Sequence, residues 1–166
     1  MTGNRARIAA ALAGVAGLIL GIAVTVVVHG EEPAQQQSAN RRRVIRPEKS
    51  PNTGLPYSPG ILVGDTLYLS GNLGRSPVTA ELVSGGIEAE TRQALANMRE
   101  VLKTAGMDFK DVASVTAYIT TFDDFATFNA VYRQFFPNDP PARATVQVAA
   151  LNVGARIELQ MIAVRR

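Results

Sequence analysis

Two helix patterns lie among strand patterns after about residue 51, and their order limits the possible folds more than any other feature. Apolar residues recur at intervals of three and four over residues 87–105, and Gly106 follows as a stop signal. A second pattern of this kind covers residues 123–136, where Pro137 ends it. Each pattern has one apolar face, so we expect two helices that each cover a hydrophobic surface.

Strand patterns surround the two helix patterns. They cover residues 60–63, 66–70, 112–119, 143–148 and 155–164, with a hairpin turn expected at Gly64-Asp65. The resulting order predicts an α+β domain with both helices on one face of a sheet. The other face carries Tyr118, Ile162 and Val164. Because such a face is too apolar to remain in water, it predicts that copies of the chain associate.

Composition excludes several kinds of site. The chain has no cysteine and one histidine, His29, which lies outside the predicted domain. Disulfides, thiolate metal sites and a histidine-based triad are therefore excluded, and we expect no metal. Six arginines and two glutamates give the first 46 residues a charge of +4, which leaves −1 of the total +3 for the rest. A domain without excess positive charge argues against nucleic acid as a partner.

The N-terminal region contains 21 consecutive residues without charge, at positions 8–28. At about 1.5 Å per residue, a helix of this length crosses a hydrocarbon core of about 30 Å. We therefore expect a single transmembrane helix at 8–28, after a short basic N-terminus at 1–7. A cleaved secretory signal is the alternative, since small residues precede Glu31 at a suitable spacing.

The segments on either side of this span bear on its orientation. Two arginines precede the span and two glutamates follow it, which favours export of the domain to the periplasmic side. The cytoplasmic side stays possible because Arg41–Arg43 follow closely. Residues 29–50 are polar and carry almost nothing to bury, so we expect a flexible linker before the domain at 51–166.

Several segments of the domain resemble one known family. They are PYSPGILVGDTLYLSGNLG at 56–74, GGIEAETRQAL at 85–95, DFATFNAVYRQFF at 124–136, PPARATVQVAAL at 140–151 and RIELQMIAVRR at 156–166. Together and in this order they resemble the Rid family, also called YjgF, the reactive intermediate deaminases. The resemblance covers nearly all of 51–166 and none of the preceding residues.

The resemblance implies a chorismate-mutase-like fold with a mixed sheet, a homotrimer packed through its sheets, and clefts between subunits. It also implies hydrolysis of 2-imino and enamino acids to 2-oxo acids and ammonia, without a cofactor. The trimer agrees with the apolar sheet face. A non-catalytic trimer that binds small carboxylates, or acts as a scaffold, is the alternative function. Chorismate rearrangement is suggested by fold analogy alone.

Arg143 is the main candidate site residue. A guanidinium can grip a carboxylate through two parallel hydrogen bonds, and every 2-imino acid carries a carboxylate. Pro140 and Pro141 fix the backbone just before it, which lowers the entropy that binding costs. From the residues alone, an arginine in an ion pair at a strand edge is the alternative. The resemblance implies that Arg143 binds the substrate carboxylate.

The resemblance also implies a set of further site residues. Substrate-binding positions carried over from it are Tyr57, Ser70, Gly71, Asn129 and Thr145, the last through its backbone amide. Turn chemistry is an equally ordinary role for Ser70 and Gly71, and a helix-surface amide for Asn129.

One departure from the family concerns the base. The glutamate thought to position or deprotonate water is matched to Gln160, which can hold water but cannot accept its proton. Glu158 lies on the same side, but about 7 Å away along a strand, so we expect it not to substitute. We therefore assign Gln160 as a catalytic residue that holds water, and we expect the protein to have weak activity. The loss of a base commonly costs about 10² to 10⁴ in rate.

Overall fold

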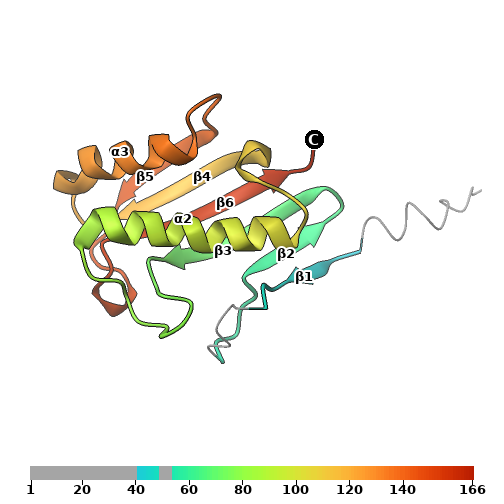
Figure 1. Cartoon of the computed structure of the whole chain (residues 1–166), viewed down its shortest axis with the longest axis horizontal. Coiled ribbons are helices and arrows are strands. Elements are labelled where there is room, and N and C mark those ends of the chain that lie inside the picture. The colour runs from blue at the N-terminus through green and yellow to red at the C-terminus, as the bar shows by residue number, and fades with distance from the viewer. Residues whose placement is uncertain (1–40, 49–53) are drawn as a thin grey trace, which may run out of the picture. The chain divides into compact units, whose positions relative to one another are not determined.

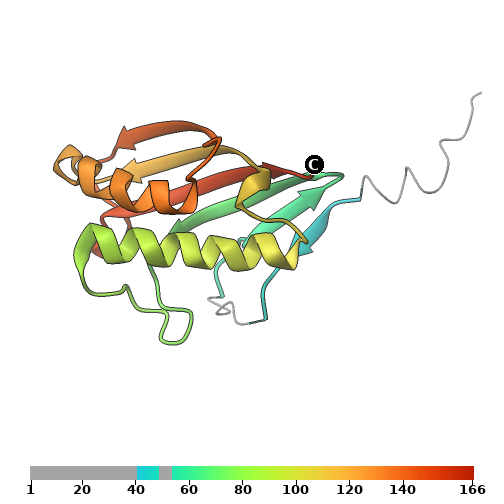
Figure 2. The same cartoon turned by 45° about the horizontal axis from the view of Figure 1, so that its top comes forward.

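The computed structural model describes residues 41–48 and 54–166. In these residues two α-helices, α2 and α3, lie on one face of a six-stranded mixed sheet (Figures 1 and 2). The elements are β1 (Arg43–Ile45), β2 (Gly60–Val63), β3 (Thr66–Leu73), α2 (Gly86–Thr104), β4 (Val112–Ile119), α3 (Phe125–Phe135), β5 (Ala142–Gln147) and β6 (Ile157–Val164). Short 3₁₀ turns cover Phe109–Asp111, Phe122–Asp124 and Asn152–Gly154. The predicted α+β class is confirmed.

The strand order is β1-β2-β3-β6-β4-β5, so the last strand in sequence lies in the middle of the sheet. Strands β4 and β5 are parallel, and the other neighbours are antiparallel. The helix α3 forms the crossover between β4 and β5, as a parallel connection requires. This topology places β5, which carries Arg143, at one edge of the sheet.

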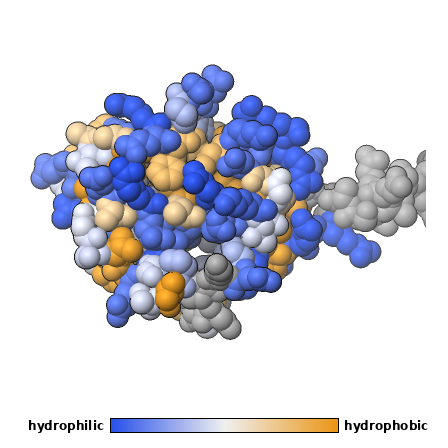
Figure 3. Space-filling view, in the orientation of Figure 1, coloured by the Kyte–Doolittle hydropathy of each residue, from blue (hydrophilic) through white to orange (hydrophobic). Residues whose placement is uncertain are grey.

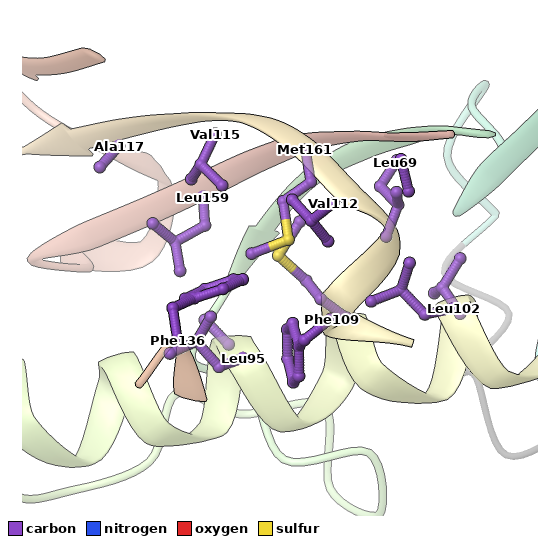
Figure 4. Packing of buried hydrophobic residues seen from close by; sticks show 14 of the residues in the cluster. Leu69, Leu95, Leu102, Phe109, Val112, Val115, Ala117, Phe136, Leu159 and Met161 are labelled. Atoms are coloured by element: carbon purple, nitrogen blue, oxygen red, sulfur yellow. The ribbon is translucent and has the colours of Figure 1, made fainter. Parts of the chain in front are cut away.

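The hydrophobic core fills the space between the sheet and the helices (Figure 4). Leu95 and Leu102 of α2 are fully buried against Leu159 and Met161 of β6 and their neighbours. Glu88 in the first turn of α2 and Lys103 in the last both complement the helix dipole.

Glycines in left-handed conformations end α2 and close the first hairpin. Gly106 has φ 73° just after α2, and Gly64 has φ 57° between β2 and β3. Both local predictions are confirmed.

The segment predicted as a flexible linker, residues 29–50, contains a strand. Arg43–Ile45 form β1, which pairs antiparallel with β2, and Ile45 is only 3% exposed. The linker prediction is therefore wrong for these three residues. They carry just two apolar side chains, and what holds them is pairing with β2, a contact that local composition does not record.

The strand predicted at 112–119 is present, but its alternation breaks near the start. The pairing register of β4 and β6 shifts between Val112 and Ser114. As a result Val112 and Val115 are both buried, while Ala113, which strict alternation places with Val115, is exposed.

The sheet face opposite the helices, called here the open face, is not covered by any of the residues that the structure describes. Its large exposed side chains are Val44, Tyr68, Val146, Ile162 and Val164, from four strands. The helix-covered side shows mainly hydrophilic residues with separate apolar patches (Figure 3). An extended apolar surface on one side of a sheet is typical of a subunit interface.

No helix in residues 41–48 and 54–166 is long and apolar enough to cross a membrane. The transmembrane helix predicted at 8–28 lies outside the described residues.

Candidate functional site

Arg143 projects from the edge strand toward the helices. It pairs in register with the buried Val115 of β4, so its side chain lies on the helix-covered face of the sheet. The guanidinium donates a 2.7 Å hydrogen bond from Nη2 to Oδ1 of Asn129 in α3. The sequence-predicted residues Arg143 and Asn129 are therefore in direct contact.

Three aromatic rings of α3 surround the Arg143 guanidinium. Its central carbon lies 4.5 Å from the ring centre of Tyr132, 4.9 Å from Phe128 and 6.0 Å from Phe125. These residues and Asn129 recur at helical spacing, which puts them on one face of α3. The rings hold the cation by cation–π attraction and leave its remaining N–H groups for a planar anion.

The charge of Arg143 has no carboxylate partner in the described part of the chain. The ion pairs there join other residues, such as Arg156 with Asp124 at 2.7 Å. A half-buried arginine held by an amide and three rings, without a counterion, is a ready binding position for an organic acid.

Tyr132 stays neutral beside this cation. Burial raises the pKa of its hydroxyl to about 12, and the charge of Arg143 opposes that rise. The hydroxyl has no hydrogen-bond partner among the described residues. Tyr132 therefore supplies a ring face to Arg143 and no negative charge.

The backbone at Thr145 is open to a ligand. Val148 N–H donates to Ile119 O of β4 at 2.9 Å. Because alternate residues of a strand point their amides to opposite sides, the Thr145 N–H points away from β4, to the free edge of the sheet. The Thr145 side chain lies on the same face of β5 as the side chain of Arg143, which is two residues earlier in the strand.

The second group of predicted residues lies on the other side of the sheet, at an irregularity in β3. The β3–β6 register shifts between Leu69 and Asn72, which makes a bulge at Ser70 and Gly71. Ser70 Oγ donates to Ser58 O at 2.6 Å, and Ser70 N–H donates to Pro59 O at 3.0 Å. Bulges of this kind commonly re-aim side chains beside active sites.

Glu158 is the acidic group beside this bulge. Its side chain lies so close to Gly71 that a Cβ built on Gly71 would overlap Oε1 of Glu158. Burial raises the pKa of the Glu158 carboxyl. A glycine at position 71 is therefore what gives the carboxylate its place, and partial desolvation makes it a stronger base.

Gln160 lies near the same bulge as Glu158. It is exposed on the open face, where it lines a small recess with Glu158 and Gly71. The three heavy atoms nearest to a Cβ built on Gly71 all belong to Glu158, which favours Glu158 over Gln160 as the group beside the bulge. Alternation along β6 places both on one face, so the sequence pattern alone could not choose between them.

A cavity of about 1030 Å³ extends from this bulge. Tyr57, Ser70, Gly71 and Glu158 line it, together with Arg75 and Asn97 from the adjoining loop and helix. Tyr57 is 49% exposed, as expected for a residue at the rim.

The residues around Arg143 and the residues around the Ser70-Gly71 bulge do not meet within one chain. Glu158 pairs with Tyr118 on the open face, while Arg143 lies on the helix-covered face of the edge strand. Strands β6 and β4 lie between β3 and β5, so the bulge in β3 and the edge strand β5 are about 14 Å apart across the sheet. Within the described residues, no cluster of three His, Cys, Asp or Glu side chains could hold a metal ion.

A family model described as Endoribonuclease L-PSP matches residues 47–165. The chain belongs to this family. A human protein named 2-iminobutanoate/2-iminopropanoate deaminase is 47% identical over 124 residues, which cover 75% of this chain and 90% of the human one. Relatives of the L-PSP chain thus include named imine deaminases.

Solved structures of the L-PSP fold agree with this assignment. A Rid family protein of unknown function from Yersinia pestis matches with a TM-score of 0.72 and 36% identity, over 75% of this chain and 100% of that one. TdcF from E. coli with bound serine matches with a TM-score of 0.71 and 33% identity, over 75% and 99%. The resemblance to the Rid/YjgF family is confirmed.

Proposed function

We propose that this chain hydrolyses small 2-imino acids, and the enamines in equilibrium with them, to 2-oxo acids and ammonia. The observation that carries the proposal is Arg143, whose charge is held by Asn129 and aromatic rings and lacks a carboxylate partner in the described residues. The relatives named as imine deaminases support the reaction class.

The substrate carboxylate binds the guanidinium of Arg143 through two parallel hydrogen bonds, and the Thr145 N–H adds a third donor nearby. Asn129 fixes the rotamer of Arg143 before substrate arrives, so little further entropy is lost on binding. We expect a small substrate, because the rings of Phe125 and Phe128 form walls around this position.

Glu158 performs the proton transfers. Its carboxylate takes a proton from water while the water oxygen bonds to the imine carbon and the C=N electron pair moves to nitrogen, and Glu158 then passes that proton to the nitrogen. In the resulting carbinolamine, Glu158 takes the hydroxyl proton as the C=O group forms and the C–N bond breaks, and it returns this proton to the departing ammonia. A carboxyl with a raised pKa suits both steps, because its pKa is moved toward the working pH.

Two copies of the chain complete one site in this proposal. Arg143 and Glu158 lie on opposite faces of the sheet in a single chain, with β4 between their strands, so one small substrate cannot contact both. Association through the open face brings Glu158 and the Ser70-Gly71 bulge of one copy toward β5 of another. A closed homotrimer is the proposed assembly, since it buries the open face of every copy equally.

The alternative function, a non-catalytic carboxylate-binding trimer, rested on Gln160 as the replacement for the base. The position of Glu158 beside Gly71 and its raised pKa favour catalysis instead.

Mixing two inactive variants tests the shared site. Arg143→Ala and Glu158→Gln chains should each lose at least about 10²-fold in ammonia release from 2-iminobutanoate, because each lacks one half of every site. When the two are co-expressed, random assembly leaves about one quarter of sites with both residues, so activity should return to about that share.

An Arg133→Ala chain serves as the control, since this arginine is exposed on α3 away from the proposed contacts. Full activity in the control with no recovery in the mixture would show that the site is not shared between copies. A native protein that does not accelerate ammonia release would disprove the deaminase function.

A further inference from the structure

The cavity beside Glu158 continues to a second arginine that carboxylate binding at Arg143 does not use. Arg75 lines the same cavity as Gly71 and Glu158. It follows two residues after Leu73, which pairs directly with Glu158 in the β3–β6 ladder. The Arg75 backbone is therefore within about 7 Å of Leu73 along the chain.

The side chain of Arg75 has a buried N–H group without an acceptor in the described residues. Its Nε is shielded from solvent and has no hydrogen-bond partner among the described residues. None of the ion pairs there includes it. A buried N–H without an acceptor costs about 1–3 kcal/mol, which a bound anion would recover.

The backbone that carries Arg75 is held firmly. Asn97 Nδ2 of α2 donates to Arg75 O at 2.8 Å, and Asn97 is itself fixed by a 2.7 Å bond from Gln93. Arg75 N–H donates to Leu73 O at 2.8 Å, and Arg75 forms a β-bridge with Leu82. These contacts make Arg75 a fixed wall residue and not part of a loose loop.

Other charged groups line the same cavity. Glu48 and Arg46 come from the segment after β1, and Glu100 from α2. Glu100 already accepts a 3.0 Å hydrogen bond from Lys103, so its charge is compensated. Arg75 is the cation of this wall whose N–H group is both shielded and unpaired in the described residues.

We propose that Arg75 binds a second carboxylate, so that the site accepts 2-imino acids with an acidic side chain, such as 2-iminosuccinate and 2-iminoglutarate. This inference rests on the proposed function. The carboxylate next to the imine binds Arg143 of one copy, the imine carbon lies by Glu158, and the side-chain carboxylate reaches Arg75 beyond Gly71. A monocarboxylic substrate uses the first two positions and leaves Arg75 unoccupied.

Substrate comparison in the full-length protein tests this. Ammonia release is measured with freshly generated 2-iminosuccinate and 2-iminoglutarate, and with 2-iminobutanoate as the monocarboxylic reference. In Arg75→Gln, kcat/KM should fall at least about tenfold for the two dicarboxylic substrates, mainly through KM, and stay within about twofold for 2-iminobutanoate. Arg75→Lys should recover part of the loss, because it restores the charge without the planar fork.

Equal losses on both substrate classes, or no loss on either, would overturn the role of Arg75 while leaving the deaminase function in place. If native protein turns over no imine at all, the proposed function fails and binding decides the inference separately. Calorimetry then compares 2-oxoglutarate with 2-oxobutanoate. A preference for 2-oxoglutarate that Arg75→Gln removes supports the second carboxylate position, and equal affinities exclude it. Thermal unfolding of Arg75→Gln confirms that the variant is folded.

Discussion

Nη2 of Arg143 and Oδ1 of Asn129 lie 2.7 Å apart, joining the edge strand β5 to the middle of α3. The bond uses one N–H of the guanidinium and leaves the others without a hydrogen-bond partner in the described residues. In the proposed site, Asn129 would therefore act on the substrate through Arg143, as a positioning residue.

Replacing Asn129 by alanine should weaken binding more than chemistry. Without its acceptor, Arg143 gains rotamer freedom that substrate must then remove, so KM should rise about three- to tenfold while kcat changes little. Arg143→Ala should impair both substrate binding and the chemical step, and lower kcat/KM by about 10² or more. Steady-state kinetics with 2-iminobutanoate distinguish the two patterns. An unchanged KM in Asn129→Ala would contradict the positioning role.

Glu158 should produce opposite pH effects on activity and on stability. As a base it must be ionised, so kcat/KM should rise with pH through its raised pKa and then level off. In Glu158→Gln this rise of kcat/KM with pH should disappear together with most of the activity. Kinetics measured from acidic to neutral pH follow both changes.

The stability effect of Glu158 follows from the same raised pKa. The folded protein binds the Glu158 proton more tightly than the unfolded chain, so its contribution to stability is fully present below about pH 4 and is lost as pH rises through the folded-state pKa. Glu158→Gln should therefore unfold at a higher temperature than native protein at neutral pH, and at a similar temperature near pH 4. A lower unfolding temperature at neutral pH would contradict this account.

Alanine at position 71 should displace the base without unfolding the protein. Gly71 does not have a positive φ, so its backbone accepts alanine, but the new methyl group overlaps Oε1 of Glu158. We expect about a 10²-fold drop in kcat and an unfolding temperature within a few degrees of native. Comparison with Glu158→Gln tests whether both changes act on one group, since the double variant should then be no slower than Glu158→Gln alone.

Removal of the Tyr132 hydroxyl should leave the site intact and stabilise the fold. The oxygen is buried and has no partner in the described residues, whereas the ring contacts Arg143 and Phe128. Tyr132→Phe should raise the free energy of unfolding by about 1 kcal/mol, measured by urea denaturation, with kcat/KM within about twofold. A large loss of activity would instead show that the hydroxyl contacts substrate.

The helices and most strands could be predicted because their side-chain periodicity is local. The repeats at 87–105 and 123–136 correspond to α2 and α3, and the turn at Gly64-Asp65 needs the positive φ that glycine supplies. The strand β1 could not be predicted, since two of its three residues are exposed and its partner lies farther along the chain.

The sequence could nominate residues for the candidate site but not their arrangement. The motifs identified Arg143, Asn129, Ser70 and Gly71, yet the register of a bulged strand decides which β6 residue lies beside Gly71. Period-two alternation gives Glu158 and Gln160 the same face and so the same apparent role. The aromatic contacts of Arg143 were missed because the helical spacing of those rings reads equally well as core packing.

The bulge in β3 also determines which face of the sheet each later residue of that strand lies on. Three steps along β3, from Leu69 to Asn72, match two steps along β6, from Met161 to Leu159. Deleting one residue there would leave two steps against two, so Asn72 would stay opposite Leu159, but the bulge that places Gly71 beside Glu158 would be lost. Chains of this lineage can therefore exchange side chains at the bulge more readily than they can change its length.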